Sequence, residues 1–514
     1  MSAVGAVTGA GGVISGGLMV CGTTSDSGKS TVVTGLCRLL ARRGVSVAPF
    51  KAQNMALNSA VTPDGHEIGR AQAAQAQAAG LPPEVAMNPI LLKPTSDRTS
   101  QVVVLGRPWA VLDAAGYQKA KAELWPIVVG QLEELRGRFD VILCEGAGSP
   151  AEINLLENDV VNLRVAAAAG FSAILVGDID RGGVFASLFG TVALLPEEWR
   201  DLVRGFVINK FRGDPALLGN GPLELERRTG IPTMGVLPWL GDLGLDAEDS
   251  LALRTPWGYR GPSDREVLDV AVIRFPRISN FTDLDALAIE PGVQVRLVSS
   301  PASLGQPDLL ILPGTKSTVS DLAWLRETGL AGAVIALAEE RPGPITILGI
   351  CGGYQMMGEE IDDPVEAATP TVVPGLGLLP VRTAFRPEKV TRVAAGTALG
   401  HPVTGYEIHH GWTEPSQPWL DLGSGPEGSQ ALDGARLGSS VHGLFEADAF
   451  RAAFLEAVAR RSGRPWAGTG ASFAVARMSR VDRLADALEE HLDLAGIETL
   501  IASSTRRRPP LVWS

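Results

Sequence analysis

The chain has 514 residues, more than one ordinary domain holds, so we expect two or three domains. Hydrophobic residues make up 45% and charged residues 20% of the sequence, a balance typical of globular proteins with buried cores. The net charge of −12 disfavours a nucleic-acid partner, because binding to phosphate backbones needs clustered Lys and Arg. A local basic pocket for an acidic small molecule remains compatible with this charge.

The four cysteines, Cys21, Cys37, Cys144 and Cys351, are spaced too widely for a C-x-x-C zinc or redox site. Such sparse cysteine usage is typical of a reducing cytoplasm, where we expect the protein to work. The first twenty residues contain no Lys or Arg and so lack the charged start of a signal peptide. No apolar run reaches the length of about 18 residues that indicates a membrane span.

Short apolar runs bounded by glycine alternate with longer segments rich in Ala and Leu. Examples are "FDVILCEGAG" and "SAILVGDID" in the first half, and "PDLLILPGTK" and "PITILGICGG" in the second. They predict buried parallel strands joined by crossover helices, so the fold class is α/β with two doubly wound domains. We expect a first domain at 1–253, a Pro- and Gly-rich linker at 254–266, and a second domain at 267–514. The amphipathic segment 479–500 is expected to close the second domain.

The stretch "CGTTSDSGKST" follows the predicted strand "GLMV" and precedes a helical pattern, which is the context of a phosphate-binding loop. In such a loop the backbone N–H groups face the phosphate oxygens, Lys29 reaches the outer phosphates and the Ser30 hydroxyl binds Mg²⁺. Five residues separate Gly22 from Gly28, one more than in the common pattern. The predicted ATP-binding residues here are Gly22, Thr23, Gly28, Lys29, Ser30 and Thr31.

Carboxylates follow two further strands of the first half, at the edge where a parallel sheet opens its ligand crevice. Glu145 ends "DVILCEGAGS", and Asp178 and Asp180 end "ILVGDIDRGG". Because Mg²⁺ prefers oxygen ligands, Glu145 and Asp180 are candidate metal ligands together with Ser30.

Amides and lysines follow the remaining strands of this half. Asn209 and Lys210 in "FVINKFRGD" are candidates for reading the adenine edge of ATP. The stretch "FKAQNMALNSA" supplies a lysine and three amides, which suit a pocket for carboxylates and amides; a solvated loop is the alternative. These candidate substrate residues are Lys51, Gln53, Asn54 and Asn58.

The stretches "GTTSDSGKS", "KAQNM", "EGAGSPAEINL", "GDIDRGGVFAS" and "NKFRGD" together resemble the synthetase half of the cobyric acid synthase family. That half belongs to a wider group similar to dethiobiotin synthetase, whose phosphate-binding loop also carries the extra residue. The resemblance covers nearly the whole chain, and it implies that a glutamine amidotransferase follows the synthetase half.

The second half supports this interpretation independently. "ITILGICGGYQ" has the form strand, G-x-C-G-G, helix, which is the thiol version of a nucleophile elbow. The sharp turn exposes the Cys351 sulfur at a helix N-terminus, and Gly349 and Gly353 allow strand and helix to pack closely. The Gly352 N–H is a candidate oxyanion donor, with a second donor expected near Gly314 and Thr315 in "LPGTKST".

A cysteine nucleophile needs a base that lowers its pKa, and His442 in "GSSVHGLFE" is the best candidate. Triad amidotransferases have a Glu two residues after this His, but here the position is Leu444. The resemblance implies a Cys–His dyad, and Glu446 or a backbone carbonyl remain alternatives for orienting the imidazole. By resemblance, Gln355 contacts the glutamine substrate.

Other polar residues are weaker candidates. His409 and His410 in "GYEIHHG", and nearby Glu407, are candidates for bordering the active site. His66 is expected to open a helix, "PDGHEIGRAQAAQAQAA", that resembles part of the corrinoid-binding region, with a capping role as the alternative.

The resemblance implies ATP- and glutamine-dependent amidation of the b, d, e and g carboxylates of adenosylcobyrinic acid a,c-diamide, with ATP and Mg²⁺ as cofactors and a small corrinoid as the partner. Cobyrinic acid a,c-diamide synthase is an alternative with the same two-part plan, although "KAQNMALN" and "VIRFPRISNFTDLDAL" favour the first assignment. A partition-type ATPase switch is a further alternative, but Cys351 and its elbow would have no use in it. The oligomeric state cannot be derived from the sequence.

Overall fold

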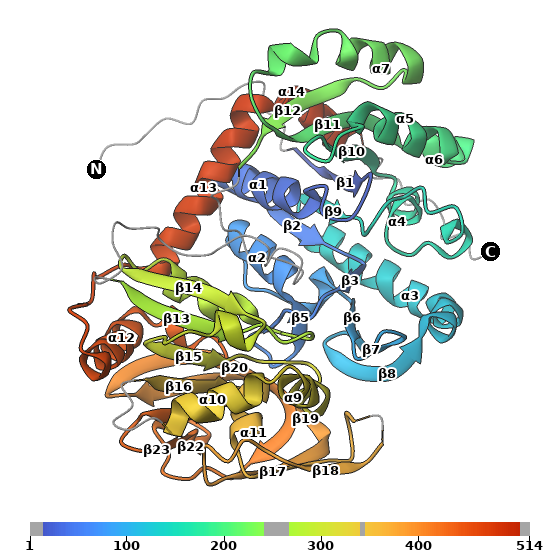
Figure 1. Cartoon of the computed structure of the whole chain (residues 1–514). Helices are drawn as coiled ribbons and strands as arrows, with labels where there is room; N and C mark the ends of the chain where they lie inside the picture. Colours follow the sequence, from blue (N-terminus) through green and yellow to red (C-terminus); the bar gives the residue numbers. More distant parts are fainter. Residues whose placement is uncertain (1–13, 241–266, 340–344, 368, 504–514) are drawn as a thin grey trace.

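A computed structural model describes residues 14–240, 267–339, 345–367 and 369–503, and it shows two α/β halves stacked one above the other (Figure 1). The first half is built on a six-stranded, wholly parallel sheet. In spatial order its strands are β12 (Thr233–Pro238), β11 (Val203–Phe211), β10 (Ser172–Asp178), β1 (Gly16–Gly22), β9 (Val141–Glu145) and β2 (Val47–Phe50).

Alternate residues of β1 belong to two different cores. Leu18 and Val20 pack into one hydrophobic cluster, and Met19 and Cys21 pack into another on the opposite face. A strand buried on both faces explains the continuous apolar run and requires helices on both sides of the sheet. The helices of this half are α1 (Lys29–Arg42), α3 (Ala114–Arg138), α4 (Leu163–Ala169), α5 (Val184–Leu194), α6 (Glu197–Arg200) and α7 (Gly221–Thr229), with short 3-10 turns η2 (Leu156–Asn158) and η3 (Pro215–Leu218).

An insertion between β2 and α3 was not predicted, and it lies between the main sheet and the second half (Figure 1). It consists of β3 (Gln53–Met55), β6 (Ile90–Pro94), β7 (Thr99–Val104) and β8 (Arg107–Asp113) in one sheet, the hairpin β4 (Ser59–Val61) and β5 (Glu67–Gly69), α2 (Arg70–Ala78) and η1 (Val85–Met87). His66 lies in the hairpin turn, where its carbonyl accepts from the Thr62 N–H at 2.8 Å, so the helix begins four residues later than predicted.

The second half has its own parallel sheet, to which one antiparallel strand is added at the edge. The order is β14 (Val293–Val298), β13 (Leu268–Ile273), β15 (Leu309–Leu312), β16 (Thr346–Ile350), β24 (Arg436–Ser439) and β23 (Ser429–Ala431). The helical elements are η5 (Phe281–Leu284), α8 (Asp285–Ala288), η6 (Pro301–Ser303), α9 (Thr318–Glu327), α10 (Leu330–Glu339), α11 (Gly352–Met357), η7 (Leu444–Glu446) and α12 (Asp448–Ser462).

A further, mainly antiparallel sheet lies beside α11 in the second half, and the sequence pattern did not reveal it. It contains β17 (Glu360–Asp363), β18 (Thr371–Pro374), β19 (Arg382–Ala398), β20 (His401–Thr413), β21 (Leu420–Leu422) and β22 (Gly425–Glu427). The polar, glycine-rich segment 414–430 includes the two short strands β21 and β22 and the start of β23. Half-exposed strands with many polar residues carry a weaker signal than buried ones, which explains the omission.

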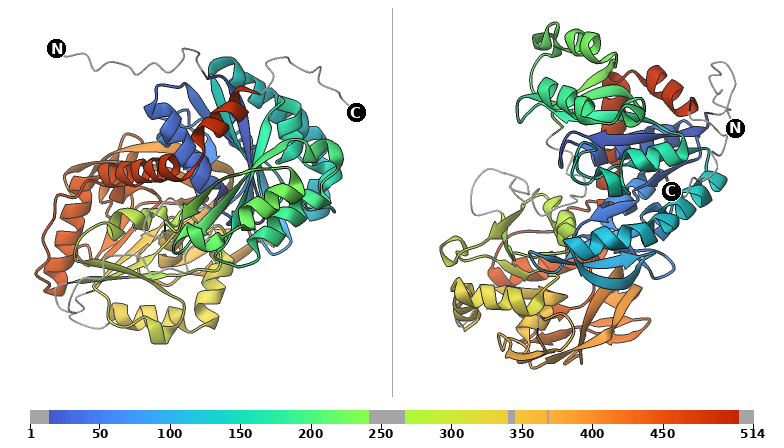
Figure 2. Two further views of the ribbon diagram at one scale, coloured as in Figure 1. Left: turned by 90° about the horizontal axis from the view of Figure 1, so that it is seen from above. Right: turned by 90° about the vertical axis from the view of Figure 1, so that its right-hand side faces the viewer.

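The two C-terminal helices do not pack where the sequence predicted. α13 (Phe473–His491) and α14 (Leu494–Ala502) were expected to close the second domain, but they pack against α1 and β1 of the first half. Leu484 and Leu488 lie in the same core as Leu36, and α13 spans both halves in Figures 1 and 2. Ion pairs such as Arg38–Asp482, 2.7 Å, border this contact. The amphipathic pattern correctly predicts a buried face, but it does not say which core covers it.

The linker expected at 254–266 lies outside the described residues. The domain limits 1–253 and 267–514 therefore remain a prediction. Within the described ranges, no helix is both long and apolar enough to cross a membrane.

Candidate active site

The cysteine in the second half sits on a strained turn between β16 and α11. Cys351 has φ 50° and ψ −109°, a backbone conformation that side-chain-bearing residues rarely adopt and that is found at functional sites. A Cβ at Gly353 would lie 1.9 Å from the Leu312 carbonyl oxygen, and one at Gly349 would lie 2.6 Å from the Tyr354 Cα. Only glycine fits at these two positions, so strand and helix pack as closely as the elbow pattern predicts.

The imidazole of His442 is brought to Cys351 by neighbouring parallel strands. β16 and β24 pair so that Ile350 lies opposite Ser439, and the Cys351 N–H donates to the Ser439 carbonyl at 2.7 Å. Both side chains thus follow the carboxyl ends of adjacent strands, although 91 residues separate them in the sequence.

A residue missed at the sequence level orients this imidazole. The Asp283 carboxylate lies 2.7 Å from His442 Nδ1 through one oxygen, and its other oxygen accepts from the Gly443 N–H at 2.7 Å. Glu446, one of the two alternatives, instead pairs with Arg70 and Arg477. Asp283 lies within "SNFTDLDAL", a stretch that resembles the family in the sequence. The sequence of this stretch does not predict that Asp283 binds His442, because the two residues are 159 positions apart.

Electrostatics favour an ionised pair. Burial by itself would raise the pKa of the Cys351 thiol, but His442, with His409 and the Gly352 N–H, holds it below its usual value. Burial would lower the pKa of His442, but Asp283 and then Cys351 raise it to about 10. With the thiol pKa lowered and the imidazole pKa raised, a single proton shared by the pair is held by His442, which favours the thiolate–imidazolium form of a cysteine nucleophile.

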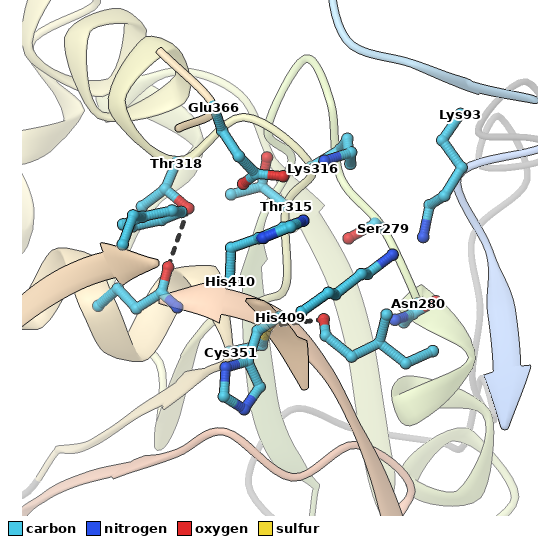
Figure 3. Close-up of a pocket in the computed structure, with 14 residues that line it drawn as sticks. Lys93, Ser279, Asn280, Thr315, Lys316, Thr318, Cys351, Glu366, His409 and His410 are labelled. Atoms are coloured by element: carbon cyan, nitrogen blue, oxygen red, sulfur yellow. Dashed lines mark hydrogen bonds and ion pairs between the residues drawn. The ribbon is translucent and has the colours of Figure 1, made fainter. Parts of the chain in front are cut away.

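Figure 3 shows a pocket into which Cys351 opens. Thirteen of its lining residues belong to the second half, and one, Lys93, comes from β6 of the first half. The lining residues are Lys93, Ser279, Asn280, Thr315, Lys316, Thr318, Cys351, Gln355, Glu366, Phe385, Lys389, Ile408, His409 and His410. The nucleophile thus lies in a largely polar cavity that reaches the contact between the two halves.

The predicted glutamine and oxyanion residues surround this pocket. Gln355 lines it and accepts a hydrogen bond from the Thr318 hydroxyl at 3.0 Å. Gly352 lies against Thr315, whose nitrogen would be 3.1 Å from a Cβ placed there. Gly314 approaches the imidazole instead, because a Cβ there would lie 2.8 Å from His442 Cε1. The loop after β15 therefore lies beside both Cys351 and His442.

Of the weaker candidates, His409 and His410 both line the pocket. The His409 ring lies 2.7 Å from the Gly411 carbonyl and 3.4 Å from Glu407, which also forms an ion pair with Arg392. Burial would lower the pKa of His409, but Glu407 and Cys351 raise it. This shift favours the protonated form of His409, whose positive charge lowers the pKa of the Cys351 thiol.

The phosphate-binding loop in the first half has the predicted strand–loop–helix geometry between β1 and α1. Lys29 begins α1, and its Nζ donates to the backbone carbonyls of Thr24 at 3.0 Å and Gly148 at 3.2 Å. Gly28 has φ 99°, and a Cβ there would lie 1.9 Å from Asn209 Nδ2. The extra residue is accommodated with Asp26 in the left-handed region at φ 58°.

A buried network surrounds the Glu145 carboxylate at the end of β9. It accepts from the Ser30 hydroxyl at 2.8 Å, from Lys51 Nζ at 2.8 Å and from Gln75 Nε2 at 2.5 Å. Burial would raise the pKa of Glu145, but Lys51, Gln75 and Ser30 hold it below its usual value. Gln75 was missed, because it lies on α2 in an alanine-rich helix with no motif around it.

Five other predicted residues have partners outside these bonds. Asp180 forms an ion pair with Arg212 at 2.7 Å, and Asn209 donates to the Ser27 carbonyl at 2.9 Å, so it supports the loop. The Gln53 side chain accepts from the Tyr117 hydroxyl, and Asn54 donates to Gln72 at 2.9 Å. Asn58 is buried where the halves meet, and it accepts from the Phe281 N–H at 3.3 Å.

The loop nevertheless fits a nucleotide and Mg²⁺. The Ser27 hydroxyl is buried and has no hydrogen-bond partner among the described residues, as expected for a donor that awaits a phosphate oxygen. No group of three His, Cys, Asp or Glu side chains forms a metal cage in the described part of the chain. Mg²⁺ in nucleotide sites typically uses one or two protein oxygens plus phosphates, so Ser30 and Glu145 suffice.

The fold and the two sites define a glutamine amidotransferase joined to a P-loop nucleotide-binding domain. Comparison with known proteins agrees: the family model of the CobQ/CobB/MinD/ParA nucleotide binding domain matches residues 18–251, and that of the CobB/CobQ-like glutamine amidotransferase domain matches residues 269–450. The cobyric acid synthase of Frankia casuarinae is 52% identical over 97% of this chain and 99% of its own length. That of Rhodococcus jostii is 53% identical over 97% and 98%, respectively. The chain belongs to the cobyric acid synthase family, glutamine-dependent ligases of cobalamin biosynthesis.

Among solved structures, the GDP complex of the signal recognition particle receptor FtsY from Elizabethkingia anophelis matches 43% of this chain and 56% of its own, with 16% identity and a TM-score of 0.26. PurLQS from Thermotoga maritima matches 42% of this chain and 96% of its own, with 17% identity and a TM-score of 0.26. Likenesses this weak carry no functional argument.

Proposed function

We propose that the chain uses ATP and glutamine to convert the b, d, e and g carboxylates of adenosylcobyrinic acid a,c-diamide into amides, which gives adenosylcobyric acid. The observation that carries this proposal is the pocket in which Cys351 lies beside the Asp283–His442 pair while Lys93 of the synthetase half forms part of the wall. A glutaminase pocket that includes a residue of the synthetase half fits a reaction in which nitrogen released at one site is used at the other. The cobyric acid synthase name of the relatives supports this substrate.

Glutamine hydrolysis begins with the Cys351 thiolate, which attacks the side-chain amide carbon and forms a C–S bond. The oxyanion that develops accepts from the Gly352 N–H. When the C–N bond breaks, His442 gives its Nε2 proton to the departing ammonia, since Nδ1 is held by Asp283. Water, deprotonated by the neutral imidazole, then cleaves the thioester, releases glutamate and restores the thiolate–imidazolium pair.

The synthetase half has to make a carboxylate electrophilic. Attack of a substrate carboxylate on the γ-phosphorus of ATP releases ADP and leaves an acyl phosphate, from which ammonia displaces phosphate. Lys29 and Lys51 neutralise negative charge around the transferred group. Mg²⁺, for which Ser30 and Glu145 are the fitting ligands, supplies further neutralisation of the phosphates when bound.

Release of ammonia inside the protein has a chemical advantage. In neutral water ammonia is mostly protonated and therefore not nucleophilic. A pocket that already extends to a residue of the synthetase half shortens the path over which the unprotonated form must survive.

Mass spectrometry of corrinoid products tests this proposal. With ATP and glutamine, adenosylcobyrinic acid a,c-diamide should gain up to four amides, whereas cobyrinic acid should not be converted to its a,c-diamide. Conversion of cobyrinic acid but not of its a,c-diamide would contradict the assigned substrate.

A further inference from the structure

The carboxylate that orients His442 lies on a short buried segment, residues 279–284, which includes η5 (Phe281–Leu284). Asn280 turns the chain there with φ 52°, and its carbonyl accepts from the Asp283 N–H at 3.2 Å. At its start, the Ser279 N–H donates to the Gly314 carbonyl at 2.9 Å. The position of Asp283 therefore depends on what holds this segment in place.

Two reciprocal hydrogen bonds between the two halves hold the segment 279–284 in place. The Ser59 N–H donates to Asn280 Oδ1 at 2.8 Å, and the Phe281 N–H donates to Asn58 Oδ1 at 3.3 Å. The side chains of Asn58 and Asn280 are 1% and 3% exposed, so water cannot readily replace either bond. We call these two bonds the asparagine clasp.

The asparagine clasp is anchored on both sides. The Ser59 hydroxyl donates to Glu67 at 2.7 Å, and Glu67 also binds Lys93 and, from β19 of the second half, Lys389. The Asn58 carbonyl accepts from the Arg70 N–H at 3.1 Å, at the start of α2. The same helix carries Gln75, which binds Glu145 in the ATP site. A single helix thus lies between the clasp and the ATP site.

We propose, on the basis of the function proposed above, that Asn58 and Asn280 are positioning residues of the glutaminase: through the asparagine clasp the synthetase half holds Asp283 against His442. The amidotransferase half thereby has a complete Asp283–His442–Cys351 arrangement only while it is docked on residues 58 and 59. Glutamine is then hydrolysed at full rate only where the ammonia can be used.

Asn58→Ala is the decisive variant, because it removes the acceptor of the Phe281 N–H and Asn58 lies outside the pocket lining. Loss of one buried hydrogen bond should lower kcat for glutamine hydrolysis about five- to tenfold. KM for glutamine should stay within about twofold, because the pocket is unchanged. The pH range of hydrolysis should narrow, since a looser Asp283 supports the imidazolium less well. The affinity for ATP should stay within about twofold, which reports that the chain is folded.

A matched pair at position 280 separates the hydrogen bond from backbone strain. Asn280→Gly keeps the left-handed backbone but removes the acceptor, so kcat for glutamine hydrolysis should fall as in Asn58→Ala; because Asn280 also lines the pocket, only kcat is compared. Asn280→Ala also removes the acceptor but disfavours the left-handed backbone, so it should lose at least as much activity as Asn280→Gly, and the difference between the two variants measures the backbone strain.

The proposal is overturned if Asn58→Ala and Asn280→Gly hydrolyse glutamine with unchanged kcat and pH profile. It is also overturned if the affinity for ATP falls in parallel with hydrolysis, because the effect would then be general destabilisation. If the wild-type chain itself shows no Cys351-dependent hydrolysis, the proposed function fails instead, which distinguishes the two.

Discussion

The two α/β halves place their chemistry at the same position of the sheet but assemble it differently. In each half a central strand of a parallel sheet ends in a tight turn, with Lys29 after β1 and Cys351 after β16. The phosphate-binding loop is one continuous stretch, and most of its groups are its own backbone amides. The glutaminase takes Cys351, His442 and Asp283 from three segments that lie far apart in the sequence.

This difference shows what each site depends on. A continuous loop carries its geometry with it, whereas a dispersed site depends on the packing of everything between its parts. A variant that removes a reacting group should therefore abolish either glutamine hydrolysis or ATP-dependent amidation and leave the other. A variant that weakens the packing between elements should not separate the two activities in this way.

Cys351→Ala should have the largest effect, because no other group in the pocket replaces a thiolate nucleophile. Glutamine-driven amidation should fall by at least about a thousandfold. Ammonium at high concentration should still support amidation, since Lys29, Lys51 and Glu145 are unchanged. Corrinoid amides counted by mass spectrometry with each nitrogen source check this, and persistent use of glutamine would show that the nucleophile is another residue.

Lys29→Ala should produce the opposite separation. Amidation with either nitrogen source should fall about a hundredfold or more, because a charge that neutralises the transferred phosphoryl group is lost. Glutamate release, followed by a coupled assay, should stay within about threefold. An equal loss of both activities would mean that hydrolysis requires a competent ATP site.

Asp283→Asn should reduce hydrolysis by about tenfold to a hundredfold and change its pH profile. The carboxylate helps raise the pKa of His442 to about 10, so the imidazolium is present at neutral pH and lost as pH rises through that value. Without the charge the pKa of His442 falls, and the alkaline limb moves to lower pH. The thiolate loses part of its cationic partner, so the acid limb moves to higher pH. Initial rates of glutamate release from pH 5 to 10 measure both limbs, and an unchanged profile would exclude this role.

Leu488→Ala should have the smallest effect on either activity but a clear one on stability. Leu488 is fully buried on α13, and its Cδ2 would lie 2.7 Å from a Cβ placed at Gly35 of α1. The free energy of unfolding should fall by about 2–4 kcal/mol, because truncation leaves a cavity. Leu488→Ala should lower the midpoint of the same unfolding transition whose midpoint ATP raises. This result would assign α13 to the core of the synthetase half.

Val475→Ala is the matched control on the same helix. Val475 is 68% exposed, so its truncation should change the free energy of unfolding by less than about 0.5 kcal/mol. Equal effects of the two variants would contradict the packing of α13 on the first half.

Much of the molecule was predictable from short patterns. The two α/β halves, the turn at Gly28 and Lys29, and the elbow at Cys351 follow from apolar runs, glycine positions and residue spacing. His442 was identified because it follows a short strand-like stretch 91 residues after Cys351. The antiparallel sheet around β19 and the insertion around α2 were missed, since short or half-exposed strands leave little periodicity.

The sequence by itself determined the chemistry that each half carries, because a phosphate-binding loop and a thiol elbow are local structures whose residues are neighbours in the chain. Tertiary structure decided which distant groups complete them: Asp283 at His442, Gln75 at Glu145, and the C-terminal helix on the first core. These choices depend on how separate elements pack. An acidic residue, an amide or an amphipathic face looks the same in the sequence whichever partner it meets.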